Sequence, residues 1–216
     1  MSNITILAYH IRHHVRNLMD YRGRIGSARL EQLSHFRPEN QIRSLCGDLL
    51  VLECLKAHNN TLTLPLQYTR AEFGKPYLPL LPNFHFNVSH SGNWVLCATG
   101  SIPLGVDIQE ERIFKPALLR ILSTSEKVFW DSVSNNQKAS TLFDFWCLKE
   151  AYCKATGQGL RLPLNSFSVS LFPPSLSDKS CCIKPIASPV NNYHIGLCVK
   201  GTVMPPVELK IVAHIE

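Results

Sequence analysis

The stretch Phe145-Trp146-Cys147-Leu148-Lys149-Glu150-Ala151-Tyr152-Cys153-Lys154 is the most informative part of this 216-residue chain. Residues four apart share one face of a helix, so Trp146, Glu150 and Lys154 form a stripe of an aromatic ring, a carboxylate and an ammonium. Such a stripe is most often an exposed ion pair that contributes about 0.2 to 0.5 kcal/mol. The stretch therefore predicts a helix, and the remaining sequence has to decide whether the helix carries a site.

A second carboxylate comes from Gly105-Val106-Asp107-Ile108-Gln109, which alternates apolar and polar residues and predicts a strand. Asp107 and Gln109 then point to the same side of that strand. Two acids on different elements, with a lysine one turn from one of them, suit a divalent cation that holds phosphates. A lone carboxylate at a strand end is usually a surface group, so both interpretations stay open for this segment alone.

The composition describes an ordinary globular protein, with 45% hydrophobic residues and a net charge of +6. The basic excess favours anionic partners in general, but the Lys/Arg block expected of a nucleic-acid arm is missing. Met1 to Tyr9 alternates like a strand and resembles neither a signal peptide nor a membrane span. Five cysteines inside apolar runs are expected to be reduced and buried, as in a cytoplasmic protein; they are Cys46, Cys54, Cys97, Cys147 and Cys198.

Hydrophobic periodicity predicts two long helices, one over 41–58 and one over 142–156, the second ended by Gly157 and Gly159. The spacing Ser123 to Glu126 predicts a capping box at the start of a third helix. A turn or loop is expected over 173–179. Extended runs are predicted at 64–68, 84–88, 94–99, 104–109, 167–171, 181–186, 193–199 and 207–213.

A weak internal repeat accompanies these elements. Leu96-Cys97 followed by Gly100 matches Leu197-Cys198 followed by Gly201, and the Leu-Pro-Leu of 64–66 matches that of 162–164. Coincidence between β-rich segments explains such short matches equally well. If the repeat is real, the fold is α+β, with two similar halves at 1–103 and 104–216 and a ligand site between them.

Two further segments could bind phosphate. Phe86-Asn87-Val88-Ser89-His90-Ser91 places small polar groups and a histidine after a predicted strand, where hydroxyls and backbone N–H groups can hold an anion. A Ser-His turn is more often only a turn. Lys75, in Gly74-Lys75-Pro76, is equally open, because a solvated lysine in such a turn is ordinary.

These motifs in this order resemble the signature set of 4′-phosphopantetheinyl transferases, in particular the large, monomeric type that activates surfactin synthetase. The resemblance rests on 74–76, 86–91, 105–108 and 145–154 and covers about 43–167. It implies a pseudo-twofold α+β fold in which each half packs a small antiparallel sheet on a long helix. The first half would bind the nucleotide of coenzyme A, and the second would carry the magnesium site and the catalytic helix.

The resemblance also implies a reaction. An Mg²⁺-dependent enzyme would move the 4′-phosphopantetheine arm of coenzyme A to a serine of an apo acyl or peptidyl carrier protein and release adenosine 3′,5′-bisphosphate. Carried over by position, Asp107 and Glu150 would hold Mg²⁺, with Glu150 as the general base, and Lys154 would neutralise the leaving phosphate. Trp146 would position the helix. The nucleotide phosphates would be bound by Arg43, Lys75, Ser89 and His90.

Gln109 departs from the pattern, since many relatives have a second acid at this position. Its carbonyl oxygen is still a possible ligand, but the site loses one negative charge and is expected to bind Mg²⁺ more weakly. Arg29 or Arg37 could contact the nucleotide. The segment 112–120 could border the carrier site through basic residues, or could pack its leucines on the core.

Two other functions remain to be compared with the transferase. A binding module for coenzyme A or a carrier protein would need Ser89 and Lys75 but neither Asp107 nor Glu150. A metal-dependent phosphoesterase would gather more carboxylates and histidines around two metal ions. We expect a cytoplasmic monomer that binds no nucleic acid and no membrane.

Overall fold

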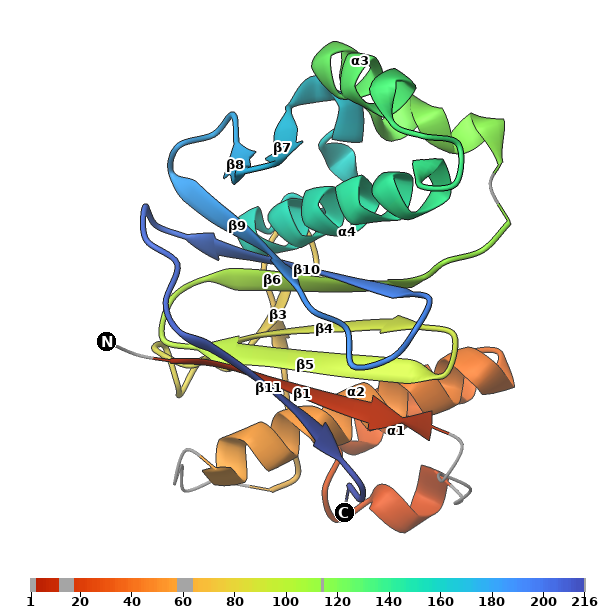
Figure 1. Cartoon of the computed structure of the whole chain (residues 1–216). Helices are drawn as coiled ribbons and strands as arrows, with labels where there is room; N and C mark the ends of the chain where they lie inside the picture. The colour runs from red at the N-terminus through yellow and green to blue at the C-terminus, as the bar shows by residue number, and fades with distance from the viewer. Residues whose placement is uncertain (1–2, 12–17, 58–63, 114, 216) are drawn as a thin grey trace.

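Four layers, helix, sheet, sheet and helix, make up the computed structural model, which describes residues 3–11, 18–57, 64–113 and 115–215 (Figure 1). One hydrophobic cluster lies between α2 and the first sheet, a second between the two sheets, and a third under α4. From the first described residues to Gly100, the elements are β1 (Ile4–His10), η2 (Leu18–Tyr21), α1 (Ser27–Ser34), α2 (Pro38–Ala57), β2 (Thr69–Arg70), β3 (Pro76–Tyr77), β4 (His85–Ser91) and β5 (Trp94–Gly100).

The second half repeats this plan and adds an outer layer of short elements over α4. Its elements are β6 (Leu104–Glu110), η3 (Pro116–Ile121), α3 (Thr124–Ser132), α4 (Lys138–Thr156), η4 (Gly159–Arg161), η5 (Leu164–Ser166), β7 (Val169–Leu171), β8 (Pro174–Leu176), β9 (Cys181–Ile186), β10 (Tyr193–Lys200) and β11 (Val207–Val212).

The two sheets share one topology. The order β1-β5-β4 in the first matches β6-β10-β9 in the second, and each sheet packs against one long helix, α2 or α4. The repeated Leu-Cys pairs lie on the matching central strands β5 and β10. The small hairpins β2-β3 and β7-β8 also correspond, and a Leu-Pro-Leu segment precedes each. The prediction of two similar α+β halves is therefore confirmed.

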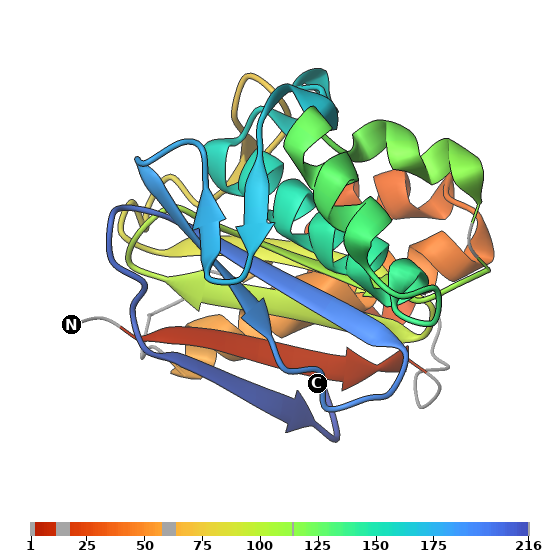
Figure 2. The ribbon, with the colours of Figure 1, turned by 45° about the horizontal axis from the view of Figure 1, so that its top comes forward.

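The last strand departs from that symmetry. β11 pairs in parallel with β1, with Ile6 opposite Leu209, so it extends the first sheet (Figures 1 and 2). The expectation of two purely antiparallel sheets was wrong at this edge, because the chain returns to cover β1. Residues 104–216 consequently contribute to both sheets.

Side chains of β4 join the two sheets. The side-chain oxygens of Asn87, Ser89 and Ser91 accept hydrogen bonds from the backbone N–H groups of Val106 (2.8 Å), Ile108 (3.3 Å) and Glu110 (2.9 Å). The constant increment of two on both strands shows that β4 and β6 run in the same direction. We call these three residues the polar seam. All three are buried, and they hold β6 in register beside β4.

Most of the predicted elements are present. The capping box is confirmed, because Glu126 Oε2 accepts from Ser123 N–H at 2.7 Å and Ser123 Oγ accepts from Glu126 N–H. The five cysteines expected to be buried are buried. Residues 64–68 do not form the predicted strand, since only Leu66 makes an isolated bridge, to Ile25. The predicted loop at 173–179 contains strand β8.

Within the described residues, the helices are too short or too polar to cross a membrane.

Candidate active site at the seam between the halves

Two glycines allow α4 to approach the second sheet closely. A Cβ on Gly105 of β6 would lie 2.2 Å from Ala151 O and 2.4 Å from Ala155 N. A Cβ on Gly196 of β10 would lie 2.5 Å from the carbonyl carbon of Cys147. These neighbours are backbone atoms of a long helix, which cannot move aside individually. The close contact brings Glu150 and Lys154 against Asp107.

Asp107 is the centre of the site, and its side chain is 2% exposed. Lys154 Nζ donates to Asp107 Oδ1 at 2.6 Å and to the carbonyl of Val106 at 3.1 Å. Gln109 Nε2 donates to Asp107 Oδ2 at 2.9 Å. Burial of a carboxylate is costly unless it is paired and hydrogen-bonded, and both oxygens of Asp107 have such partners.

Ser89, which belongs to the first half, contacts the carboxylate of Asp107 in the second half. Its hydroxyl donates to Asp107 Oδ1 at 2.7 Å and accepts from Lys154 Nζ at 2.9 Å, besides accepting from Ile108 N–H. A serine hydroxyl has one hydrogen to donate, and here Asp107 receives it. Ser89 therefore orients Asp107, and it lies in strand β4 rather than in the expected turn.

Glu150 lies half-buried on the same face of α4. Burial raises the pKa of its carboxyl, the negative charge of Asp107 raises it further, and Lys154 partly offsets both effects. The carboxylate oxygens of Asp107 and Glu150 are hard donors of the kind that Mg²⁺ prefers. Among the described residues, three or more His, Cys, Asp or Glu side chains nowhere gather as a metal cluster. A cation held by Asp107 and Glu150 would have to complete its shell with water and ligand phosphates.

Two predicted phosphate-binding residues line a cavity of about 350 Å³ at one end of this cluster. We call it the Arg43 cavity, after Arg43, which lines it together with His90, Gln109 and Trp146. Arg43 Nε donates to the carbonyl of Gly92 at 2.9 Å. The pKa of His90 is lowered by partial loss of water around its ring and by the charges of Lys154 and Arg43.

Lys75 lies at the opposite end, apart from the Arg43 cavity. Its Nζ donates to three backbone carbonyls, those of Leu104 (2.9 Å), Lys154 (2.7 Å) and Ala155 (3.2 Å). Burial lowers the pKa of this ammonium to about 8. In this structure Lys75 therefore binds the end of α4 and the start of β6, which differs from the phosphate contact that the resemblance implies.

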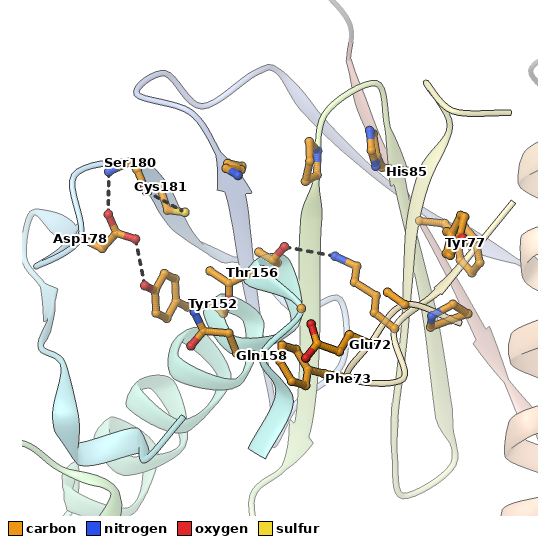
Figure 3. A pocket seen from close by; sticks show the side chains of 18 of the residues that line it. Glu72, Phe73, Tyr77, His85, Tyr152, Thr156, Gln158, Asp178, Ser180 and Cys181 are labelled. Atoms are coloured by element: carbon orange, nitrogen blue, oxygen red, sulfur yellow. Dashed lines mark hydrogen bonds between the residues drawn. The ribbon is translucent and has the colours of Figure 1, made fainter. Parts of the chain in front are cut away.

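Lys75 also lines a larger cavity of about 640 Å³. Tyr152, Asp178 and Cys181 lie on one wall, and Tyr77 and His85 lie on the other (Figure 3). Tyr152 donates to Asp178 at 2.9 Å, which fixes the first wall. Cavities of this size at the boundary of two structural units are where small ligands usually bind.

Several other predicted residues have defined places. Trp146 packs on the core beneath α4 and stacks on Phe143, with ring centroids 6.4 Å apart. Arg29 pairs with buried Asp48 at 2.8 Å, so it joins α1 to α2. The segment 112–120 forms only a short helical turn, in which Leu118 and Leu119 pack on the core. Its residue 114 lies outside the described part of the chain.

Sequence reasoning missed a buried ion pair behind α4. Lys149 Nζ lies 2.9 Å from Glu126 Oε1, and the two side chains are 0% and 1% exposed. Lys149 also donates to the carbonyls of Leu164 and Phe167, both at 2.7 Å. The sequence signal for this pair was the combination of Glu126 in the capping box and Lys149 within an otherwise apolar part of the later helix.

Sequence reasoning also missed His194 of β10, which contacts Asp144 in the N-terminal half of α4. His194 Nδ1 lies 2.7 Å from Asp144 Oδ1, and Nε2 lies 3.1 Å from Glu111 Oε2. Burial alone would lower the pKa of His194, but the two carboxylates outweigh it and raise the pKa. This contact joins α4 to the end of β6 across β10. The opposing carboxylates come from distant parts of the sequence, so spacing gave no indication of it.

Fold and site together define a protein with two related halves and a cluster of charged side chains where the halves meet. Two sequence models cover most of the chain: the N-terminal region of 4′-phosphopantetheinyl transferases matches residues 25–102, and the 4′-phosphopantetheinyl transferase superfamily matches residues 103–198. The chain belongs to the 4′-phosphopantetheinyl transferase superfamily.

Individual relatives agree with this assignment. The chain is 37% identical over 140 residues to the 4′-phosphopantetheinyl transferase Sfp of Bacillus subtilis (strain 168), which covers 63% of this chain and 61% of that protein. It is 35% identical over 126 residues to the transferase gsp of Aneurinibacillus migulanus, covering 58% and 52%. The aligned region thus spans about three fifths or less of these relatives' own lengths.

Among solved structures, the holo-[acyl-carrier-protein] synthase of Thermotoga maritima matches with a TM-score of 0.40 and 21% identity, over 47% of this chain and 64% of that one.

Proposed function

We propose that the protein transfers the 4′-phosphopantetheine arm of coenzyme A to a serine of an apo acyl or peptidyl carrier protein. The observation that carries the proposal is the cluster of Asp107, Lys154 and Ser89, which draws residues from both halves and has Glu150 beside it. A cavity lies at each end of this cluster, so a long ligand has space on both sides.

Asp107 and Glu150 would hold Mg²⁺ in this proposal. The side-chain carbonyl of Gln109 is a third candidate ligand, because its amide nitrogen already faces Asp107. When bound, the cation would offset the negative charge of the coenzyme A pyrophosphate. The pKa of Glu150 is raised first by burial and then by the negative charge of Asp107, and a bound cation would offset the second of these effects.

Glu150 would act as the general base. The carrier serine oxygen attacks the phosphorus that bears the pantetheine arm, its proton passes to Glu150, and the bond to adenosine 3′,5′-bisphosphate breaks. Glu150 is half-buried on the face of α4 that carries Lys154, so its carboxylate lies beside the cluster where this proton has to be accepted. Lys154 would stabilise charge that develops on the leaving phosphate, and it is already within reach of the cluster.

Arg43 and His90 would bind nucleotide phosphate in the Arg43 cavity. Arg43 lines that cavity, and the planar fork of N–H donors on a guanidinium matches the geometry of phosphate oxygens. Ser89 would contribute through its hold on Asp107, since its only hydrogen is already donated there. The first half, 1–103, would thus serve the nucleotide, and 104–216 would serve the metal and the chemistry.

We also propose a cytoplasmic monomer. All eight cysteines are free thiols, which suits a reducing compartment. The two halves within one chain already supply both sides of the seam, so a second copy is not needed to complete the cluster. The mild positive charge would favour an acidic carrier.

One assay tests the activity. The protein is mixed with an apo carrier, coenzyme A and Mg²⁺, and the carrier is weighed by mass spectrometry; a gain of one phosphopantetheine is expected. Glu150→Ala should lower the rate by about 10²-fold or more. Glu208→Ala, which changes an exposed glutamate on β11, is the matched control and should leave the rate unchanged.

The same reactions separate the other two functions. A binding module would bind coenzyme A, measured by calorimetry, without modifying any carrier. A phosphoesterase would consume coenzyme A when the carrier is omitted. Absence of transfer to a panel of acyl and peptidyl carriers would refute the transferase.

A further inference from the structure

The loop 71–75, which joins β2 to β3 in the first half, reaches the end of α4 in the second. Within the loop, Ala71 N–H donates to the carbonyl of Lys75 at 2.9 Å, and Gly74 N–H donates to that of Ala71 at 2.8 Å. Gly74 has a φ of +84°, a left-handed conformation that favours glycine. The loop therefore presents Lys75 from a tight, hydrogen-bonded turn.

Lys75 meets α4 in its last turn, where the carbonyl of Lys154 also accepts from the N–H of Gly157 at 3.3 Å. The Nζ of Lys75 donates to the carbonyls of Lys154 and Ala155 and to that of Leu104 at the start of β6. A cation at a helix C-terminus is favoured by the helix dipole, and a carbonyl oxygen can accept two hydrogen bonds. One ammonium thus ties the loop, the helix end and the strand that leads to Asp107.

A second contact holds the same loop to the same region. The guanidinium of Arg161, in the short helix after α4, lies over the ring of Phe73 at 5.0 Å. The loop is therefore fixed to the second half on both sides of Gly74. The lysine whose backbone carbonyl receives Lys75 is Lys154, whose side chain holds Asp107 and Ser89.

We propose that Lys75 is a positioning residue: it fixes the last turn of α4 so that Lys154 stays against Asp107 and Ser89. Its ammonium donates to backbone carbonyls, so Lys75 affects the reaction only through the position of Lys154. This role rests on the proposed transferase activity for its catalytic consequence, and on the contacts alone for its effect on α4.

Lys75→Met keeps the length of the side chain and removes the charge and the donors. Lys184→Met, which changes an exposed lysine on β9, is the matched control. Hydrogen exchange of the amides of 153–157 is followed by mass spectrometry. We expect about tenfold faster exchange in Lys75→Met and no change in the control. Unchanged exchange in Lys75→Met would overturn the inference whether or not the protein is a transferase.

A double-mutant cycle tests the route through Lys154. At saturating coenzyme A, Lys75→Met should lower kcat about tenfold in the native background and have no further effect in Lys154→Met. A general structural defect would lower kcat equally in both backgrounds and would contradict the route.

Calorimetry with adenosine 3′,5′-bisphosphate distinguishes the phosphate-binding alternative. A positioning residue leaves the Kd of this ligand within about threefold, whereas loss of a phosphate contact weakens it by about tenfold or more. A weakened Kd with unchanged exchange would overturn the inference. If Lys75→Met does not fold, Lys75→Arg, which keeps the charge and several donors, should retain part of the protection at 153–157; full loss of protection in that variant would count against the inference.

Discussion

Lys154 Nζ on α4 lies 2.6 Å from Asp107 Oδ1 on β6, and Ser89 of the other half contacts both residues. The ion pair is therefore part of the joint between the halves as well as part of the site. Asp107 is buried, so its charge depends on these partners, while the side chain of Lys154 is 24% exposed. Stability and activity should consequently change together when the pair is altered.

Lys154→Met should destabilise the protein by about 2 kcal/mol, less than the 3–5 typical of a fully buried pair because the lysine is partly exposed. The variant leaves Asp107 buried without its cation. Lys154→Met combined with Asp107→Asn should recover part of that loss, measured by urea denaturation. Lys210→Met, from an exposed pair with Glu208, is the control and should cost about 0.5 kcal/mol or less. A double variant less stable than Lys154→Met alone would contradict this account.

Gly105→Ala should separate α4 from the second sheet. The added Cβ meets backbone atoms at 2.2 and 2.4 Å, so the helix that carries Glu150 and Lys154 has to shift. A displacement of about 1 Å at reacting groups can cost about 10²-fold in rate. Transfer kinetics and urea denaturation measure the two effects. Gly23→Ala, whose Cβ would have no neighbour within 4 Å, should leave both unchanged.

Gln109→Glu should lower the Mg²⁺ concentration that half-maximal activity requires. A third carboxylate strengthens a hard-cation site, and Gln109 already contacts Asp107. Without metal the same substitution should destabilise the protein, because it replaces a hydrogen-bond donor with a like charge. Thermal unfolding with and without Mg²⁺ tests both statements. An unchanged metal requirement would exclude Gln109 from the ligand shell.

His194 should make stability depend on pH. Both ring nitrogens face carboxylate oxygens, so only the protonated ring can donate to both. Because the pKa of His194 is raised on folding, its contribution is complete below its ordinary value of about 6.5 and is lost as the pH rises through the raised value. His194→Gln should therefore lose most stability near pH 6 and differ least from the native protein at alkaline pH. His214→Gln, at an exposed histidine, should show no such trend.

The sequence was sufficient for the architecture and for placing Glu150 and Lys154 near Asp107. Periodicity located α4 and most sheet strands, and the stripe of Glu150 and Lys154 does meet Asp107. These features depend on local spacing and on residue type, both of which a single sequence contains. The Leu-Cys repeat on β5 and β10 was also informative, since matching strands of two like halves need similar packing.

Contacts between distant segments were beyond such reasoning. Ser89-His90 was expected in a turn just after a strand, whereas both residues lie within β4, where Ser89 and Ser91 face β6. For Lys75 the resemblance implied a phosphate contact, and its contacts with backbone carbonyls have no sequence signature. Gly105 and Gly196 allow a close approach that only the packed helix reveals.

The polar seam has a consequence for how such a site can diversify. Three short side chains of β4, rather than a backbone ladder between the sheets, set the spacing between the halves in the contacts described above. Exchanging Asn for Ser, or Ser for Asn, at one of these positions changes the reach of the accepting oxygen by about one bond, and the strand pairing inside each sheet does not involve these side chains. Selection or protein engineering can therefore adjust the width of the site through three alternate positions, while each half keeps its own core.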